Sequence, residues 1–369
     1  MKDSKFNIFV PLQKGYLIYN TLSGSLVCAD EKLKNSICAI GRKTRDRSLS
    51  SYIASLQKLG MIIPDDCDEY KMYQYLFHRM KFNNDLFNAF LVLTYDCNLD
   101  CRYCYERKLR SRMSMSVDTA TAIVRKIKDI IADRRSKRLN LLFYGGEPLL
   151  NFQRITQICD HLMDFTKKHN IEFRTHLITN GVLMTSEIVD RLLTYNLEQV
   201  QVTIDGPTAV HDSRRHFRDG SGSFDIIFRN LHNYVGKVEI GLRINIDKSN
   251  VGHVPSLLDF LLQQGLREYV DLSFGFVYGY LTHKCESFLA DKNVGQELVR
   301  LWKLAMKRGF KLHWAPEIFH ICDAMRDLSS LHLPALKASL SSVGGIAGAA
   351  ARYDQRQYNL NLSTLTSPS

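Results

Sequence analysis

The chain has 369 residues, of which 45% are hydrophobic and 24% are charged. This balance excludes wholesale disorder, collagen-like repeats and a disulfide-dense mini-protein, and the length suits two domains or one large α/β domain with additions. The 49 Lys and Arg residues exceed the 38 Asp and Glu residues, which gives a formal net charge of +11. Because the basic residues are scattered, we favour a solvated basic surface over a nucleic-acid groove and expect no nucleic-acid partner.

The sequence contains no run of eighteen or more uncharged apolar residues, so we expect no membrane partner. Residues 1–6 carry no apolar core of a signal peptide, which predicts a cytoplasmic protein. The nine cysteines are an odd number, and in the cytoplasm they are not expected to form a disulfide framework. Six of them are scattered, whereas Cys97, Cys101 and Cys104 lie within one short segment.

Residues 1–85 are expected to form a small separate module. A helix is predicted over Ser48–Leu59, because apolar residues recur there at helical spacing, and Gly60 ends it. Residues 65–84 follow as a charged, helical connector. Strands are predicted at Phe6–Val10, Tyr16–Asn20, Leu26–Val27 and Met61–Pro64. Strands arranged around a helix in this order indicate a winged-helix-like module.

From residue 86 onwards the pattern alternates regularly between strands and helices. Strands are predicted at Ala89–Tyr95, Leu139–Tyr144, Glu172–Thr179, Gln199–Ile204, Val238–Ile246 and Val270–Val277. Helices are predicted between them at Val117–Ala132, Phe152–Lys168, Ser186–Tyr195, Phe224–Tyr234 and Val254–Gln264. This alternation predicts an α/β fold with parallel strands and helical crossovers. Six such units suit an open, partial (β/α)6 barrel with functional residues at the carboxyl ends of its strands.

Cys97, Cys101 and Cys104 directly follow the first strand of this region with the spacing C-x3-C-x2-C. Three thiolates on one loop would place three soft ligands around one point. Structural zinc would need a fourth ligand, which no nearby His or Cys supplies, whereas a [4Fe–4S] cluster held by three cysteines leaves one iron open. Three buried thiols without a metal are the alternative, but neither packing nor β-propensity explains their density.

A cysteine motif with an aromatic residue before its last Cys, after a first strand, resembles the signature of the radical S-adenosylmethionine (radical SAM) enzymes. Further matches follow successive strands in the order that this family has, and the resemblance covers roughly residues 88–300. The matching segments are Tyr144–Leu149, Ile178–Gly181 and Thr203–Pro207, continued by His211, Asp212, Arg215 and Gly220–Phe224. The resemblance implies that residues 86–300 are a radical SAM core.

The resemblance also implies the cofactors. Cys97, Cys101 and Cys104 would ligate a [4Fe–4S] cluster whose open iron binds S-adenosylmethionine (SAM). An electron from a donor such as ferredoxin or flavodoxin would cleave SAM and release a 5′-deoxyadenosyl radical, which abstracts a hydrogen atom from the substrate. The cofactor carries this chemistry, while the protein positions it. Tyr103 would pack over the cluster and the adenine.

Other residues are assigned to SAM by the same resemblance. Gly145, Gly146 and Glu147 would meet the amino group of SAM, and the two glycines suit this role because they let the backbone approach a ligand closely. Thr203 stands where close relatives have Ser, and its hydroxyl would bond the SAM carboxylate. Arg215 would pair with the same carboxylate, with a surface salt bridge as the alternative.

Asp205 is interpreted as a turn-forming residue before Gly206 and Pro207.

The stretch from Asp205 to Phe224 resembles the branch of the family that modifies peptides and proteins. Members of this branch usually end in a cysteine-rich SPASM domain. After the barrel this chain has only Cys285 and Cys322, and residues 301–334 resemble no more than the start of such a domain. Residues 335–369 lack periodicity and are expected to be a poorly ordered tail, as a frameshift or truncation would produce.

The sequence supports three functional hypotheses. The first is a peptide maturase that installs a thioether or carbon–carbon crosslink in a ribosomally made precursor peptide. Its residues 1–85 would bind the leader as an added strand, and an acidic leader would suit the basic chain; a packing extension is the alternative for this module. The second hypothesis is an anaerobic sulfatase maturase that forms formylglycine. The third is a truncated remnant that binds a leader peptide without catalysis.

Overall fold

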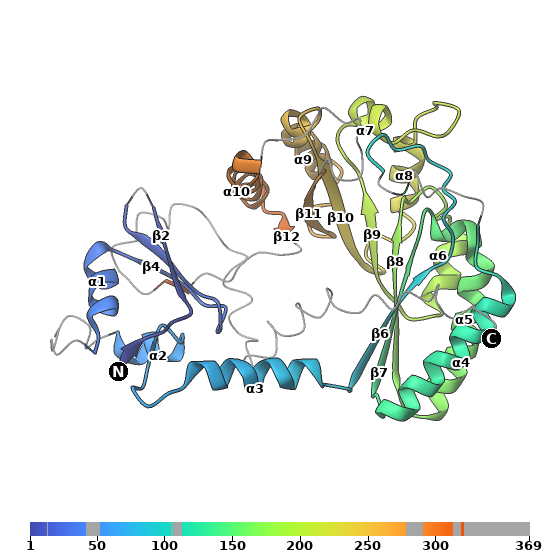
Figure 1. The fold of residues 1–369 in the computed structure, drawn as a ribbon. Helices are drawn as coiled ribbons and strands as arrows, with labels where there is room; N and C mark the ends of the chain where they lie inside the picture. Colours follow the sequence, from blue (N-terminus) through green and yellow to red (C-terminus); the bar gives the residue numbers. More distant parts are fainter. Residues whose placement is uncertain are drawn as a thin grey trace. The chain divides into compact units, whose positions relative to one another are not determined.

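The computed structural model describes residues 1–12, 14–41, 52–104, 106, 113–277, 291–312 and 319–320. The chain divides into two units, one built on Met1–Asn83 and the other on Asn84–His313 (Figure 1). Each unit has its own buried apolar core, and each is described by itself. Within the part of the chain that the structure describes, no helix is long and apolar enough to span a bilayer.

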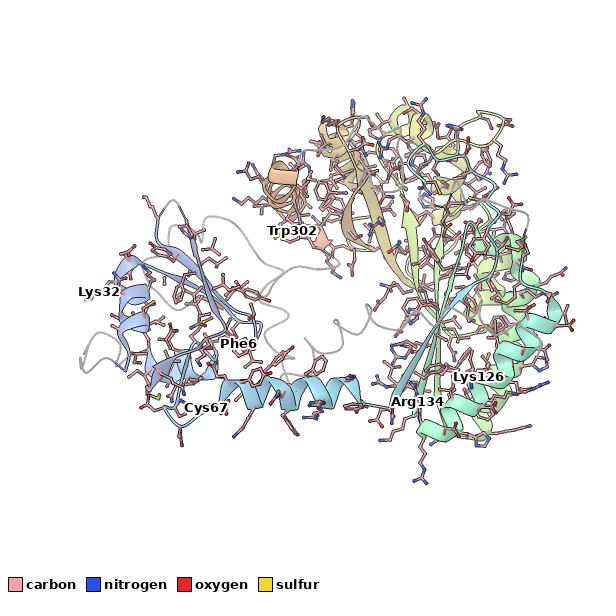
Figure 2. All side chains as sticks on the ribbon, viewed as in Figure 1. Phe6, Lys32, Cys67, Lys126, Arg134 and Trp302 are labelled. Carbon is pink, nitrogen blue, oxygen red and sulfur yellow. The ribbon has the colours of Figure 1, made fainter. Side chains whose placement is uncertain are left out.

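The first unit contains a four-stranded sheet in the order β13-β4-β3-β2. Its strands are β2 (Asn7–Pro11), β3 (Tyr16–Asn20), β4 (Leu26–Ala29) and β13 (Phe319–His320). A two-stranded ribbon joins β1 (Lys2–Asp3) to β5 (Ile62–Ile63), and the helices are α1 (Glu31–Ala39), α2 (Ile53–Lys58) and α3 (Glu69–Lys81). Ile18, Val27, Ile37 and Leu56 form the centre of its core. In Figure 2, Phe6 lies near the start of α3, and its ring centroid is 6.0 Å from that of Tyr73.

The strands predicted for this unit are present, but its helices differ from the prediction. Helix α1 was not predicted, although Asp30 gives it a regular N-cap by accepting a hydrogen bond of 2.7 Å from the Leu33 backbone N–H. The helix predicted over Ser48–Leu59 is described only as α2, from Ile53, because residues 48–51 lie outside the described residues. The connector predicted over 65–84 contains α3.

The second unit is built on a seven-stranded parallel sheet in the order β12-β11-β10-β9-β8-β7-β6. The strands are β6 (Leu86–Val92), β7 (Arg138–Tyr144), β8 (Glu172–Thr179), β9 (Leu197–Thr203), β10 (Glu239–Ile246), β11 (Val270–Phe276) and β12 (Lys311–Leu312). The helices are α4 (Val117–Arg134), α5 (Phe152–Lys168), α6 (Ser186–Leu193), α7 (Thr208–Arg214), α8 (Phe224–Leu231), α9 (Val254–Gln263) and α10 (Asp291–Lys307), with 3-10 turns at Pro148–Asn151 and Val251–His253.

Helices cover one face of this sheet, and the alternation of buried residues along the strands shows why. In β7, Leu139, Leu141 and Phe143 are buried, whereas the residues between them are partly exposed. The helices α4 and α5 lie along this face (Figure 1). At the end of α4, Arg134 (Figure 2) lies over the ring of Phe87 in β6, with its guanidinium carbon 5.7 Å from the ring centroid.

The predicted partial barrel is confirmed, because all six predicted strands are present as β6 to β11 and the sheet ends at β6 and β12 without closing. Strand β12 adds a short seventh strand, and α7 and α10 were not predicted. Cys285, Cys322 and the tail predicted over 335–369 lie outside the described residues. The region predicted over 301–334 is described only to residue 312 and at 319–320.

Candidate functional site

The four motifs of the sequence meet at the carboxyl ends of β6 to β9. The cysteine loop follows β6 and lies directly against the loop after β7. The backbone N–H of Gly146 donates to the carbonyl of Thr94 (2.9 Å), and that of Glu147 donates to the carbonyl of Asp96 (2.8 Å). These bonds fix the start of the cysteine loop one residue before Cys97.

Gly145 and Gly146 are required by this contact between loops. A Cβ atom on Gly145, whose φ is +144°, would lie 2.4 Å from the Thr94 carbonyl oxygen. A Cβ atom on Gly146 would lie 2.2 Å from the carbonyl oxygen of Asp96. The close approach for which these glycines are needed in the structure is that of the cysteine-loop backbone, and their predicted contact with SAM stays a prediction.

Glu147 was expected to meet SAM, but its carboxylate is fully buried and bonded within the protein. One oxygen accepts hydrogen bonds from the Thr179 hydroxyl (2.8 Å) and the Leu149 backbone N–H (3.1 Å), and the other accepts from the backbone N–H of Asn180 (2.8 Å). Burial raises the pKa of Glu147 above its usual value despite these bonds. Its carboxylate therefore joins the loop after β7 to the end of β8.

Asn180 is a site residue to which sequence reasoning gave no role. Its side-chain amide donates to Asn98 Oδ1 (2.7 Å) and lies 3.7 Å from the sulfur of Cys97. The available signal was its place in the Ile178–Gly181 motif at the end of a strand. Asn180 thus connects the loop after β8 to the segment of the first cysteine, Cys97.

The cysteine loop is held from its other side by residues 211–224, which we call the strap. The backbone N–H groups of Asp100 and Arg102 donate to the carbonyls of His216 (2.8 Å) and Arg214 (3.1 Å), respectively. An ion pair between Asp96 and Arg218 adds a side-chain contact. Cys97 and Cys101 are buried in this arrangement, and Cys104 is half-buried.

Residues of the fourth motif connect the two ends of the strap by hydrogen bonds. Asp212 Oδ1 accepts hydrogen bonds from the backbone N–H groups of Ser223 (2.8 Å) and Phe224 (2.9 Å). The ring of His211 lies 3.1 Å from the Ser223 hydroxyl, which donates to the Arg215 carbonyl (2.5 Å). Burial, together with the charges of Arg215 and Arg214, holds the pKa of His211 well below its usual value. These motif residues shape the strap.

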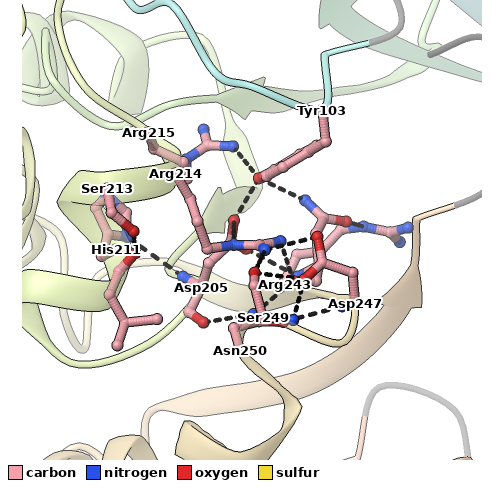
Figure 3. Close-up of polar contacts among 12 residues, drawn as sticks. Tyr103, Asp205, His211, Ser213, Arg214, Arg215, Arg243, Asp247, Ser249 and Asn250 are labelled. Atoms are coloured by element: carbon pink, nitrogen blue, oxygen red, sulfur yellow. Dashed lines mark hydrogen bonds and ion pairs between the residues drawn. The ribbon is translucent and has the colours of Figure 1, made fainter. Parts of the chain in front are cut away.

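Tyr103, between the second and third cysteines, is anchored by its hydroxyl (Figure 3). The phenol donates to Asp205 Oδ2 (2.5 Å) and accepts from Arg215 Nη1 (2.7 Å) and Asn245 Nδ2 (3.2 Å). Burial raises the pKa of Tyr103 well above its usual value, and the nearby Asp205 and Cys101 add to this effect against the opposing charge of Arg215. Tyr103 therefore stays protonated and keeps donating to Asp205.

Asp205 is the centre of a buried charge network, which corrects its interpretation as a turn-forming residue. Its carboxylate is fully buried and also accepts from Arg214 Nε (3.3 Å) and the Asn245 backbone N–H (2.9 Å). Arg214 pairs in addition with Asp247 (2.7 Å), and its guanidinium carbon lies 4.9 Å from the ring centroid of Tyr103. The carboxylates of Asp205 and Asp247 balance the positive charge of the Arg214 guanidinium, because a buried charge requires an oppositely charged partner.

Arg215 is only 8% exposed, so the alternative of a surface salt bridge is wrong. Burial alone would lower its pKa, but Cys101, Tyr103 and Asp205 outweigh that effect and raise it well above its usual value. Its Nε atom is buried and has no hydrogen-bond partner among the residues that the structure describes. Thr203, at the end of β9, is also buried, with 8% of its surface exposed.

These residues suit a [4Fe–4S] cluster and SAM by two observations. Cys97, Cys101 and Cys104 lie on one loop, which hydrogen bonds hold to the loops after β7 and β8 and to the strap. A four-iron cluster takes each of its cysteines at a separate iron atom, which suits three cysteines on one loop. The orphaned Nε of Arg215, beside Cys101, is a donor for an anionic ligand group.

The profile of the Radical SAM superfamily matches residues 91–261 of the chain. The radical SAM cyclopropyl synthase TigE of Paramaledivibacter caminithermalis is 28% identical over 153 residues, which are 38% of this chain and 31% of that protein. The mycofactocin maturase MftC of Mycobacterium tuberculosis is 32% identical over 156 residues, which are 42% of this chain and 36% of that protein. The chain thus spans about a third of the length of these curated relatives.

Among solved structures, the fold is similar to that of native anSMEcpe with bound AdoMet and a Kp18Cys peptide. The TM-score is 0.51 with 20% sequence identity, and the alignment covers 62% of each chain. Proteins of the superfamily use a [4Fe–4S] cluster and SAM. The order of the four strand loops, the cysteine motif and the profile match agree, and residues 91–261 of this chain are a domain of the radical SAM superfamily.

Proposed function

We propose that the chain is a radical SAM enzyme that abstracts a hydrogen atom from a precursor peptide and installs a thioether or carbon–carbon crosslink. The observation that carries the proposal is the buried guanidinium of Arg215. Tyr103 holds it near Cys101, and its Nε has no hydrogen-bond partner in the described part of the chain. When bound, a [4Fe–4S] cluster and SAM supply the radical chemistry of the superfamily.

The protein's own residues hold and orient these groups. We assign Cys97, Cys101 and Cys104 to the cluster, and Arg215 and Thr203 to the carboxylate of SAM. Tyr103 acts through Arg215, because their hydrogen bond of 2.7 Å fixes the guanidinium in place. Gly145, Gly146 and Glu147 support the loops by contacts within the protein, and only their remaining backbone groups are assigned to SAM.

Two features favour a peptide as substrate. The first is that the relative MftC is named a maturase, whereas the relative TigE is named a cyclopropyl synthase, so the names do not point to one product. The second is the sheet of the first unit, in which β2 stands at one end of the strand order. An extended peptide can pair with such an edge. Ile8 and Val10 are exposed on one face of β2, and we assign this edge to the leader peptide.

The radical SAM chemistry is tested with protein that is reconstituted anaerobically and reduced with dithionite. Added SAM should give 5′-deoxyadenosine and methionine even without a peptide. Arg215→Gln should weaken SAM binding by about tenfold or more while the iron content stays unchanged, because a charge-assisted bond to the carboxylate is lost. Arg191→Gln is the matched control, since Arg191 forms an exposed pair with Asp160. A chain that binds iron and SAM but forms no 5′-deoxyadenosine would be the non-catalytic remnant.

The substrate is tested with each short peptide that the genes neighbouring that of this chain encode. A crosslink removes two hydrogen atoms from the peptide, and fragmentation by mass spectrometry locates the joined residues. Conversion of a Cys or Ser side chain to an aldehyde would instead identify a sulfatase maturase. We place the reaction in the cytoplasm, with a ferredoxin or flavodoxin as the electron donor.

A further inference from the structure

Arg243 in β10 carries a charge that the described part of the chain does not balance. Its Nε donates to Asn245 Oδ1 (3.0 Å), which is the one hydrogen bond of this guanidinium among the described residues. No described carboxylate forms an ion pair with it, whereas Arg214 has two such partners. The residue is half-buried, and its Nη1 and Nη2 atoms remain accessible to solvent. Because a charge that is partly removed from water needs a partner, this guanidinium suits an anion from outside the chain.

The side chain of Arg243 lies on the face of the sheet that the helices leave uncovered. Leu242 and Ile244 are buried in the core, so Arg243 between them points to the opposite face. Arg243 stands in register with Thr203 on β9, and neighbours in register share a face about 4.8 Å apart. An anion bound by Arg243 would therefore lie beside the residue that we assign to the carboxylate of SAM.

Asn245 fixes the guanidinium relative to the cysteine loop. Its side-chain amide donates to the hydroxyl of Tyr103 (3.2 Å), and its backbone N–H donates to Asp205 Oδ1 (2.9 Å). Figure 3 shows Arg243 within this network of polar contacts. A single side chain thus connects Arg243 to the phenol that lies between Cys101 and Cys104, and the direction of the guanidinium is set by that side chain.

The neighbouring strand leaves room for this guanidinium. A Cβ atom on Gly275 in β11 would lie 2.1 Å from Arg243 Nη2. The φ of Gly275 is not positive, so its backbone conformation does not require glycine. Gly241, on the same face of β10, differs, because the nearest atom to its Cβ would be 3.9 Å away. A glycine inside a strand often marks such a close approach, and here the approaching group is Arg243.

We propose that Arg243 binds a carboxylate of the substrate peptide, either from an Asp or Glu side chain or from the C-terminus. This inference rests on the proposed peptide-modifying function and names the group by which the peptide is held. A guanidinium with two unpaired terminal nitrogens matches a carboxylate by two parallel hydrogen bonds. Since Arg215 and Thr203 are assigned to the carboxylate of SAM, Arg243 is left for the substrate. It is a specificity-determining residue that places an acidic group of the peptide beside the cysteine loop.

Binding is tested on the reconstituted full chain with SAM and phenylglyoxal, which modifies accessible arginine side chains. Mass spectrometry gives the rate at each arginine, and Arg243 should react faster than the buried, paired Arg214. Two N-acetylated tripeptides serve as probes. Amidated Gly-Glu-Gly has only a side-chain carboxylate, and Gly-Gly-Gly with a free C-terminus has only a terminal one.

At millimolar concentration, at least one of these two probes should slow the reaction of Arg243 about twofold or more, because a bound carboxylate shields the guanidinium. The probe that protects Arg243 identifies the source of the carboxylate. Amidated Gly-Gln-Gly, which has no carboxylate, should not protect it. The exposed Arg191 is the control site and should react equally with every probe. Equal rates at Arg243 with all three tripeptides would overturn the inference.

Two variants test the role in turnover. With a peptide that the chain modifies, Arg243→Gln should lower kcat/KM about tenfold or more, and Arg243→Lys should restore only part of it, because Lys keeps the charge without the fork. Gly275→Ala should lower kcat/KM as well, since its Cβ displaces the guanidinium, whereas Gly241→Ala is the matched control and should not.

The affinity for SAM separates this inference from the assignment of the cofactor. Arg243→Gln should bind SAM as the parent does. Weaker SAM binding together with unchanged peptide kcat/KM would assign Arg243 to SAM and overturn the inference. A parent chain that cleaves no SAM would contradict the proposed function instead, and the protection of Arg243 by the tripeptides would still decide whether this residue binds a carboxylate.

Discussion

The phenol of Tyr103 donates a hydrogen bond of 2.5 Å to the carboxylate of Asp205, although the two residues lie 102 positions apart in the sequence. The bond ties the cysteine loop to the end of β9. Arg215 donates to the same phenol, so one hydroxyl connects the loop to the strap as well. Because Tyr103 lies between Cys101 and Cys104, this contact fixes the position of the last two cysteines.

Removal of that hydroxyl should destabilise the protein. Tyr103→Phe leaves Asp205 and Arg215 each without one hydrogen-bond partner in a buried place, which costs about 1–3 kcal/mol of the free energy of unfolding. Urea unfolding followed by circular dichroism measures the change. Tyr269→Phe is the control, because Tyr269 is exposed, and it should leave stability unchanged. Equal midpoints for parent and Tyr103→Phe would show that the network adds no net stability.

Substitution of Gly146 should affect the cysteine loop itself. In Gly146→Ala, the new Cβ would meet the Asp96 carbonyl oxygen at 2.2 Å, so the backbone beside Cys97 must shift. We expect a lower iron content after anaerobic reconstitution, together with weaker SAM cleavage. In Gly252→Ala, the Cβ meets nothing within 4 Å, and iron content should be unchanged. A variant at Gly146 that keeps all its iron and loses only SAM cleavage would favour the ligand role over the contact between loops.

The cluster assignment is checked by iron analysis. The reconstituted parent should hold about four iron atoms per chain if one [4Fe–4S] cluster is present. Replacement of Cys97, Cys101 and Cys104 by Ala should remove essentially all of it. Cys38→Ala serves as control, because Cys38 is exposed in the first unit and far from the motif in sequence. Iron retained by the triple variant would place the cluster elsewhere, and about eight or twelve irons in the parent would indicate auxiliary clusters.

His211 predicts a pH dependence of stability. Burial first, and then the charges of Arg215 and Arg214, hold its pKa well below the usual 6.5, so the folded protein keeps the ring neutral. Below that pH the unfolded chain binds a proton at this position and the folded chain does not. The free energy of unfolding therefore falls as the pH falls below 6.5, by up to about 1.4 kcal/mol per pH unit for this one group.

The comparison is made with His211→Gln, in urea unfolding from about pH 7 to about pH 5. This variant lacks the titrating group, so its free energy of unfolding should depend less steeply on pH below 6.5, even if it is less stable overall. Parallel pH dependences for the two proteins would mean that the folded protein also protonates His211 in this range.

The leader assignment predicts a loss of peptide binding from changes on β2. An Ile8→Glu and Val10→Glu double variant should bind a fluorescently labelled precursor peptide at least about tenfold more weakly in anisotropy, because the added charges repel an acidic leader and remove the apolar face. Dithionite-driven SAM cleavage should not change, since the cysteine loop belongs to the other unit. A Tyr269→Glu and Val299→Glu double variant, at exposed apolar positions of the second unit, is the control. Unchanged affinity would assign residues 1–85 to packing.

The sequence by itself determined the features that local patterns encode. Apolar periodicity located β6 to β11 and the helices between them, because burial of one face selects residues at regular spacing. The three cysteines could also be found from the sequence, because residues that act together on one loop are close in sequence. Helix α1 was missed although Asp30 marks its start, because Leu33 and Ile37 are its only large apolar residues and two positions give a weak period.

Only the tertiary structure decided how the motifs act on one another. That Asp205 accepts a bond from Tyr103, and that Glu147 faces Thr179 and Asn180, depends on strands that are brought side by side over long stretches of chain. Arg214 and Arg215 are the same residue type at adjacent positions, yet Arg214 pairs with two carboxylates, whereas Arg215 has a buried nitrogen with no partner among the described residues. The difference arises because burial and partners, unlike residue type, are properties of three-dimensional packing.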